Sequence, residues 1–167
     1  VACGVTLVIV AGEIDISVGS LLGFLGVLLG LLTSSAHAGL PVPLAVLLVL
    51  AAGAGIGLVN GVLTACLGIP SIIVTLGMLT ILRGVTELLM GGQWITDLPP
   101  GLRCLGIGSL GGIPISIWAA LAVCLAAGVF TRFTPAGRRV YAVGSNPRAA
   151  ALYGLSLARV KIMVFTI

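Results

Sequence analysis

The apolar run that decides the fold spans residues 44–66 and reads LAVLLVLAAGAGIGLVNGVLTAC. It contains no charged residue, and about 20 apolar residues are enough for a helix to cross a bilayer core. Further apolar segments occupy residues 1–11, 17–32, 71–90 and 115–131, and another begins near residue 160. The sequence therefore predicts an all-α, polytopic transmembrane helical bundle with about five membrane segments and the start of another.

The composition also indicates a membrane protein. Hydrophobic residues make up 59% of the 167 residues and charged residues only 7%, whereas a soluble domain carries about 25% charge. So few charges cannot cover a water-facing surface, and the lipid bilayer is the expected surrounding. The net charge of +4 comes from basic residues that gather near one end and form no platform with aromatic residues, which argues against nucleic acid as a partner.

The basic residues predict how the chain is oriented in the membrane. Residues 134–161 contain five of the eight Lys and Arg residues and no acid, so the positive-inside rule places them in the cytoplasm. Parity then puts residues 66–71 on the inner side, and the loops at 33–43 and 91–114 outside. By the same parity, GEIDIS at residues 12–17 lies toward the inner side or within a broken helix, and the sequence leaves both open.

Neither a metal site nor an enzymatic site is predicted. The cysteines show no C-x-x-C spacing and mostly lie in or beside apolar runs, which is typical of small buried side chains. They are Cys3, Cys66, Cys104 and Cys124. His37 lies in a loop far from them in sequence. Because G-x-x-x-x-G-K-[ST], G-x-S-x-G and H-E-x-x-H are absent, we expect no catalytic residue and no cofactor bound by this chain.

Small residues predict where the helices approach one another. Two series of glycines recur at helical spacing: Gly53, Gly57 and Gly61, and then Gly19, Gly23, Gly26 and Gly30. Because helices in lipid associate through close backbone approach at small residues, both ridges are expected to face other helices, with a glycine-lined passage for solute as the alternative. Asn60 lies on the first ridge, where a buried amide either joins two helices or faces a solute.

Three stretches of the sequence carry a family resemblance. They are GEIDISVGS at residues 12–20, NGVLTACLGIPSIIVTLGMLTILRG at 60–84 and GRRVYAVGSNPRAAALYGLSLARVK at 137–161. In this order and spacing they resemble the permease subunits of bacterial ABC sugar importers of the ribose, xylose and rhamnose type, which include permeases for autoinducer-2. GGQWI, residues 91–95, favours the autoinducer or rhamnose branch. Members are about twice as long, so residues 1–167 are expected to form a single transmembrane permease domain that is a fragment of a longer chain.

The resemblance also implies candidate site residues. The matched positions that are candidates for the substrate pathway or the helix break are Asp15, Ser17, Asn60 and Thr75. Glu13 departs from the glycine that is more usual at this position in the family, so no role is carried over to it. We favour Asp15 as a cap for a helix that begins at Ile16 or Ser17, and direct contact with solute is the alternative.

The basic segment fits a short cytoplasmic coupling helix. Residues 144–147 are expected to form a turn in which Asn146 or Ser145 caps a helix that Pro147 begins and Gly154 ends. Ala149, Ala150, Leu152 and Tyr153 would then present an apolar surface. From the resemblance, the candidates for coupling to the ATPase are Arg138, Asn146, Arg148, Ala149, Ala150, Leu152 and Gly154. A helix that binds lipid headgroups is the alternative.

The resemblance implies the permease subunit of an ATP-driven importer in the bacterial cytoplasmic (inner) membrane, moving a monosaccharide or similar small polar solute. Its partners would be cytoplasmic ABC ATPase subunits that use ATP, an extracytoplasmic solute-binding protein, and a second permease subunit in a homodimer or heterodimer. The residues themselves also permit an ion-coupled secondary transporter that uses Glu13 and Asp15. A structural membrane subunit is the third alternative.

Overall fold

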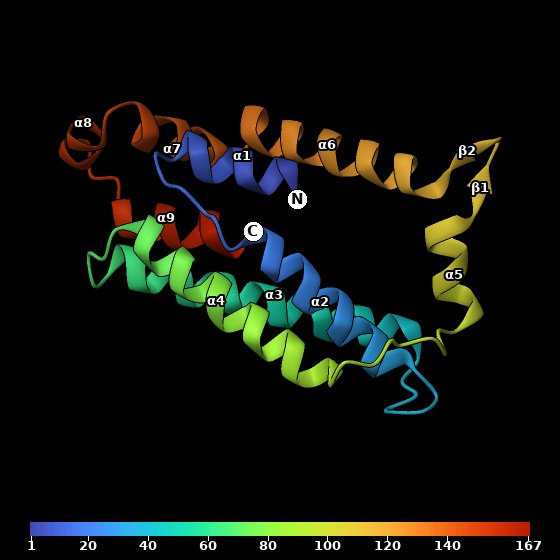
Figure 1. The fold of residues 1–167 in the computed structure, drawn as a ribbon. Helices are drawn as coiled ribbons and strands as arrows, with labels where there is room; N and C mark the ends of the chain where they lie inside the picture. The colour runs from blue at the N-terminus through green and yellow to red at the C-terminus, as the bar shows by residue number, and fades with distance from the viewer.

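The computed structural model describes the backbone of residues 1–167, and the side chains of all of them except Arg103, Cys104, Leu105, Ile107 and Leu110. The chain is almost entirely helical, which confirms the predicted fold class (Figure 1). In chain order the elements are α1 (Ala2–Val10), α2 (Val18–Thr33), α3 (Val42–Ala65), α4 (Ser71–Met90), α5 (Pro100–Ile107), β1 (Ser109–Leu110), β2 (Ile113–Pro114), α6 (Ile115–Phe133), α7 (Pro135–Ser145), α8 (Pro147–Leu152) and α9 (Leu157–Thr166).

Three helices in the described chain are long and apolar enough to cross a membrane, namely α3, α4 and α6. The apolar α2 has 16 residues, so at 1.5 Å per residue it reaches about 24 Å, short of the roughly 30 Å of a bilayer core. The structure therefore supports a polytopic helical bundle, in which three of the about five predicted membrane segments are helices long enough to cross a bilayer and the others are shorter.

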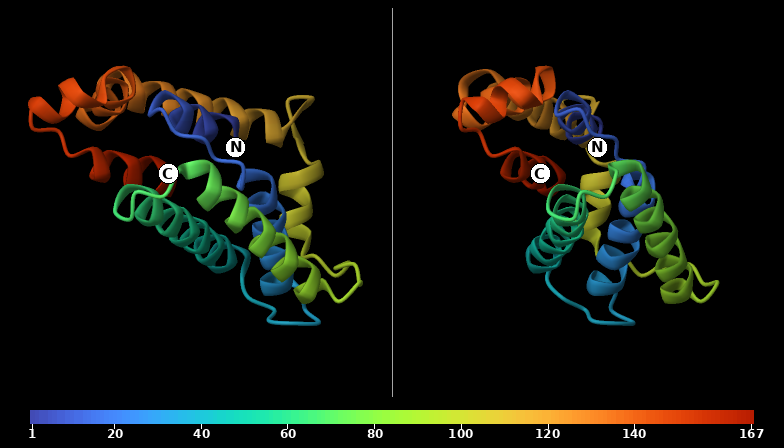
Figure 2. Two further views of the ribbon diagram at one scale, coloured as in Figure 1. Left: turned by 60° about the vertical axis from the view of Figure 1, so that its left-hand side comes forward. Right: turned by 90° about the vertical axis from the view of Figure 1, so that its left-hand side faces the viewer.

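The helices form two groups that α9 connects. In Figures 1 and 2, α2, α3 and α4 lie together in one group, while α1, α6, α7 and α8 lie in the other. Helix α9 contacts α3 on one side and α1 and α7 on the other. The buried hydrophobic core lies where α1, α7, α8 and α9 meet: Leu7, Val8, Ala11, Val140, Val143, Ala150, Val160, Val164 and Phe165.

The two ends of the molecule agree with the predicted parity. The turn between α3 and α4 lies at the same end as α8, and the α2–α3 and α4–α5 connections lie at the other end (Figure 1). The predicted outer loop at 91–114 differs in detail, because it contains α5 and a hairpin in which β1 and β2 pair antiparallel, with Ser109 opposite Pro114.

The predicted glycine ridge of α3 is confirmed at the interface with α9. A Cβ atom on Gly61 would lie 2.8 Å from the Cα of Ile162, and one on Gly57 would collide with the carbonyl oxygen of Phe165. The ridge of α2 differs, because a Cβ at Gly19, Gly23 or Gly26 would meet no atom within 4 Å. The expectation that the α2 ridge faces another helix is therefore not met by the described chain.

A glycine predicted in a turn proves to be a packing residue. Gly144 and Ser145 belong to α7, so Asn146 alone separates α7 from α8. A Cβ on Gly144 would collide with the carbonyl oxygen of Val10 at the end of α1. The glycine is required by this close approach of two helices, which a turn assignment from sequence does not reveal.

The cysteines are not the small buried residues that the sequence predicts. Cys66 and Cys124 are exposed and Cys3 is half-buried, with the Sγ atoms of Cys3 and Cys124 3.5 Å apart. A thiol behaves as a small hydrophobic group, so an outward-facing position on an apolar helix suits it as well as an interior one. The side chain of Cys104 lies outside the described residues.

Candidate functional site

The GEIDIS stretch is an unwound linker between α1 and α2. Helix α1 ends at Val10, Gly12 takes a left-handed conformation with φ +82°, and the Gly12 and Glu13 amides donate to the carbonyls of Ile9 and Val8. This is the usual way for glycine to terminate a helix. The linker then returns from the end of α1 toward the middle of the molecule, where α2 begins (Figure 1). The break thus starts at the end of the molecule that holds α8 and reaches into the bundle (Figure 1).

Two side chains of α4 bind the backbone of the linker. The Ile14 amide donates to Ser71 Oγ at 3.2 Å, and Thr75 Oγ1 donates to the Ile14 carbonyl at 3.5 Å. An unpaired backbone group in lipid costs several kcal/mol, and these bonds replace those that a helix would supply. Thr75, one of the four pathway candidates, therefore lies against the break.

The Asp15 carboxylate holds the start of α2. Its Oδ1 atom accepts from the Ser17 amide at 2.8 Å and from Ser17 Oγ at 2.6 Å. Helix α2 begins at Val18 with Ser17 as its N-cap residue, so the predicted start at Ile16 or Ser17 is slightly early. A carboxylate beside a helix N-terminus interacts favourably with the helix dipole, which makes Asp15 a support for the helix start.

Asn60 joins α3 to this start. Its Nδ2 atom donates to Ser17 Oγ at 3.3 Å, and its side chain is only 1% exposed. Among the described side chains, Asn60 Oδ1 and Thr64 Oγ1 are buried without a hydrogen-bond partner. The four candidates Asp15, Ser17, Asn60 and Thr75 therefore gather around one linker. Thr64 was not predicted, although it lies one helical turn after Asn60 and so shares its face.

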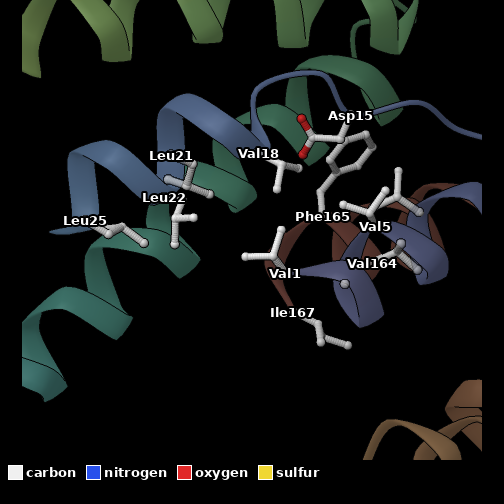
Figure 3. Close-up of a pocket in the computed structure, with 12 residues that line it drawn as sticks. Val1, Val5, Asp15, Val18, Leu21, Leu22, Leu25, Val164, Phe165 and Ile167 are labelled. Atoms are coloured by element: carbon white, nitrogen blue, oxygen red, sulfur yellow. The ribbon is translucent and has the colours of Figure 1, made fainter. Parts of the chain in front are cut away.

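Pockets lie on both sides of the linker. The pocket beside Asp15 has a volume of about 170 Å³ and is mainly apolar, with walls from α1, α2 and α9. Figure 3 shows the Asp15 carboxylate near Val18 and Phe165 in this pocket. The pocket beside Glu13 is larger, about 370 Å³, and it includes Thr64, Ser71 and Lys161. The two carboxylates of the linker thus face different surroundings.

Glu13 has a partner that sequence reasoning missed. Its Oε1 atom lies 2.5 Å from Nζ of Lys161 on α9, and the two side chains are 11% and 29% exposed. The ion pair connects the linker to α9, whose first residues belong to the predicted coupling segment. No local pattern in the sequence could have revealed it, because the partners lie at opposite ends of the chain.

A short helix, α8, is present where the sequence places the coupling helix. The Ala149 amide donates to Asn146 Oδ1 at 3.0 Å, Pro147 is the first helical residue, and Gly154 follows the helix with φ +78°. These features confirm the expected cap, start and end of the helix. Asn146, and not Ser145, is the N-cap residue of α8.

The exposed surface of α8 and of the residue after it carries two large apolar side chains and one arginine. Leu152 and Tyr153 are each 89% exposed, and Arg148 is also exposed. Ala150 differs from the expectation that placed it on this surface, because it is 4% exposed and packs into the core. A six-residue helix needs one small residue against the body of the protein, and Ala150 supplies it.

The remaining coupling candidates are Ala149 within α8 and Arg138 in the first turn of α7. Ala149 is half-buried and Arg138 is exposed on α7, where its Nη1 donates to the Phe133 carbonyl at 3.4 Å. These residues are separate from the linker, and α9 connects the two regions. No group of three or more His, Cys, Asp or Glu able to hold a metal ion occurs among the side chains that the structure describes.

Comparison with known proteins identifies relatives for the whole chain. Residues 1–167 match the family described as branched-chain amino acid transport system / permease component. The chain is 40% identical over 166 residues to the autoinducer 2 import system permease protein LsrC of Salmonella paratyphi B, covering 99% of this chain and 47% of that protein. It is 38% identical over 172 residues to LsrC of Escherichia coli K12, covering 99% and 48%. It thus spans about half the length of these relatives, and no solved structure matches it.

Proposed function

This chain belongs to the family of branched-chain amino acid transport system permease components, and we propose from this that it is part of the permease subunit of an ATP-driven importer in the cytoplasmic (inner) membrane. Residues 1–167 form one transmembrane permease domain. The solute is a monosaccharide or a similar small polar molecule, and the names of the relatives favour autoinducer-2. The chain performs no covalent chemistry and binds no cofactor itself.

Three kinds of protein partner follow from this function. ABC ATPase subunits hydrolyse ATP in the cytoplasm and dock on the coupling segment at residues 134–161. A solute-binding protein delivers solute to the outer connections at 33–43 and 91–114. A second permease subunit, identical or related, completes the pathway within the lipid bilayer.

The observation that carries this proposal is the surface of α8. Leu152 and Tyr153, both 89% exposed, lie on the segment that carries most of the basic residues and that the positive-inside rule places in the cytoplasm. Large apolar side chains exposed together on such a surface favour a protein partner. A helix laid into a groove of the ATPase would bury both side chains, with Arg148 at the rim.

Helix α9 supports the transmission of movement from that surface. It follows α8 directly, packs against α3 at Gly57 and Gly61, and carries the Lys161 partner of Glu13. A displacement of α8 by a bound ATPase would therefore act on the linker through α9.

Reconstitution of the full-length permease with its ATPases and binding protein in proteoliposomes tests this function. Uptake of autoinducer-2 and of D-ribose is expected to require ATP and to resist a protonophore. L152D is expected to abolish uptake and the binding of ATPase subunits, because it places a charge in a buried contact, while the permease remains folded. Arg132→Gln, outside α8, is the control.

Two results would contradict the proposal. Uptake that persists without ATPases and collapses with the protonophore would favour the secondary transporter that uses Glu13 and Asp15. Retention of ATPase binding by L152D together with loss of binding to anionic vesicles would favour a lipid-binding role for α8.

A further inference from the structure

The pocket beside Glu13 has a polar lining that the support of the helix break does not explain. The pocket has a volume of about 370 Å³ and opens to the surface. It is lined by the unwound linker, the end of α3, the turn between α3 and α4, the start of α4 and one residue of α9. Its polar side chains are Glu13, Thr64, Ser71 and Lys161. The pocket lies at the end of the molecule that holds the α3–α4 turn, the end that parity places in the cytoplasm.

Thr64 lines this pocket with an unused hydroxyl. Its side chain is 5% exposed, and its Oγ1 atom has no hydrogen-bond partner among the described residues. A buried polar group without a partner costs about 1–3 kcal/mol. One helical turn earlier, Asn60 Oδ1 is in the same condition, so polar atoms without partners lead from the pocket toward the linker and α2.

The Glu13–Lys161 ion pair forms part of the pocket lining. Both residues line it, and their charged atoms are 2.5 Å apart. One partner belongs to the linker and the other to α9, so the pair can separate when these two elements move relative to each other. Charges that are 11% and 29% exposed become hydrated once separated, because water then enters the pocket.

We propose that this pocket is the inner end of the solute pathway and that the Glu13–Lys161 ion pair is its gate, an inference that rests on the importer function proposed above. The pocket suits a small neutral molecule with several hydroxyl groups. The paired charges leave no net charge to attract an ion, and the hydroxyls of Thr64 and Ser71 both donate and accept hydrogen bonds. Movement of α8 by the ATPase draws Lys161 away and opens the gate.

The gate is tested by measuring access to Thr64 in the full-length permease. Thr64→Cys is introduced after the native cysteines are replaced by serine, and labelling by a charged, membrane-impermeant methanethiosulfonate is followed in inside-out vesicles. E13Q and K161Q are each expected to speed labelling about tenfold, the factor that corresponds to a loss of about 1.4 kcal/mol of interaction energy. The charge exchange of Glu13→Lys with Lys161→Glu is expected to restore slow labelling.

Matched controls separate the gate from general loosening. E87Q breaks the ion pair between Arg83 and Glu87, whose side chains are 76% and 72% exposed, and it is expected to leave labelling unchanged. A chain that keeps exposed Cys66 as its single cysteine should label quickly in every background. Ser71→Cys is a second reporter within the pocket, used in the same way where Thr64→Cys reduces the yield of folded protein.

Unchanged labelling in E13Q, or rapid labelling of the charge-exchange variant, overturns the gate. In a second arm, D-ribose is expected to slow labelling of the E13Q reporter and D-ribose 5-phosphate is not. Equal slowing by both, or by neither, overturns the assignment of a neutral hydroxylated solute. Because neither arm contains ATP or ATPase subunits, failure here is distinct from failure of ATP-driven import.

Discussion

Helices α2 and α3 have similar glycine spacing but different surroundings. On α3, Gly57 and Gly61 lie so close to the backbone of α9 that an added Cβ would clash. On α2, Gly19 and Gly23 face open space in the described chain. The spacing of small residues thus shows where two helices are able to approach closely, and the path of the rest of the chain decides whether they do.

The largest effect is expected at the contact between α3 and α9. Gly57→Val would force the backbone of α9 away from α3, because the new side chain collides with the Phe165 carbonyl. Such overlap with a backbone atom belongs to the severe class of substitutions, at about 4 kcal/mol or more. The yield of monodisperse full-length protein in detergent is expected to fall sharply. Gly55→Val, where the same helix has open space, should keep a normal yield, and equal yields would contradict the packing described for α9.

A smaller change at the same interface should give an intermediate effect. The Cβ of Gly61→Ala would lie 2.8 Å from the Cα of Ile162, a strain that overpacking data place at about 1–3 kcal/mol. The thermal unfolding midpoint should fall relative to Gly55→Ala. An unfolding midpoint equal to that of Gly55→Ala would show that α9 can move away from α3 without loss of stability.

The start of α2 depends on a carboxylate, whereas Gly19, Gly23 and Gly26 of its glycine ridge face open space in the described chain. Asp15→Ala removes both hydrogen bonds from Ser17 and should lower stability by about 0.5–2 kcal/mol, as loss of a helix cap does. Asp15→Asn, which keeps an acceptor oxygen, should recover part of it in thermal unfolding. A variant D15A that assembles normally but transports nothing would instead assign Asp15 to solute contact.

The smallest effect is expected on the open face of α2. Gly23→Ala meets no atom within 4 Å and gains helix propensity of up to about 1 kcal/mol. The unfolding midpoint of the full-length protein should therefore stay constant or rise slightly. A loss as large as that of Gly61→Ala would mean that a helix covers this face in the assembled permease.

Local patterns in the sequence predicted the features that local physics decides. The bounds of α4, the Asn146 cap and the glycine after α8 follow from apolar length, capping chemistry and backbone freedom within a few residues. The family resemblance named Asp15, Ser17, Asn60 and Thr75 as candidates but did not predict that they lie together. The structure shows their proximity through hydrogen bonds that join the linker, α3 and α4.

Features that depend on distant contacts could not be predicted in this way. The partner of Glu13 lies on α9, and no periodicity links the two residues. Gly144 resembles a turn residue until the end of α1 is placed beside it, and Ala150 resembles a surface residue until the core beneath α8 is known. In each case the missing information was which helix lies next to which.

The bonds between the linker and α4 also constrain the order of membrane assembly. The partners of the Ile14 amide and carbonyl lie 57 and 61 residues later in the chain, so they have not been synthesised when the linker leaves the ribosome. Because an unwound backbone in lipid is costly without partners, the linker cannot settle into its native place until α4 has been inserted. Ser71 and Thr75 thus make the folding of the linker a late step in biogenesis. Their loss should slow this step more than it affects the mature protein.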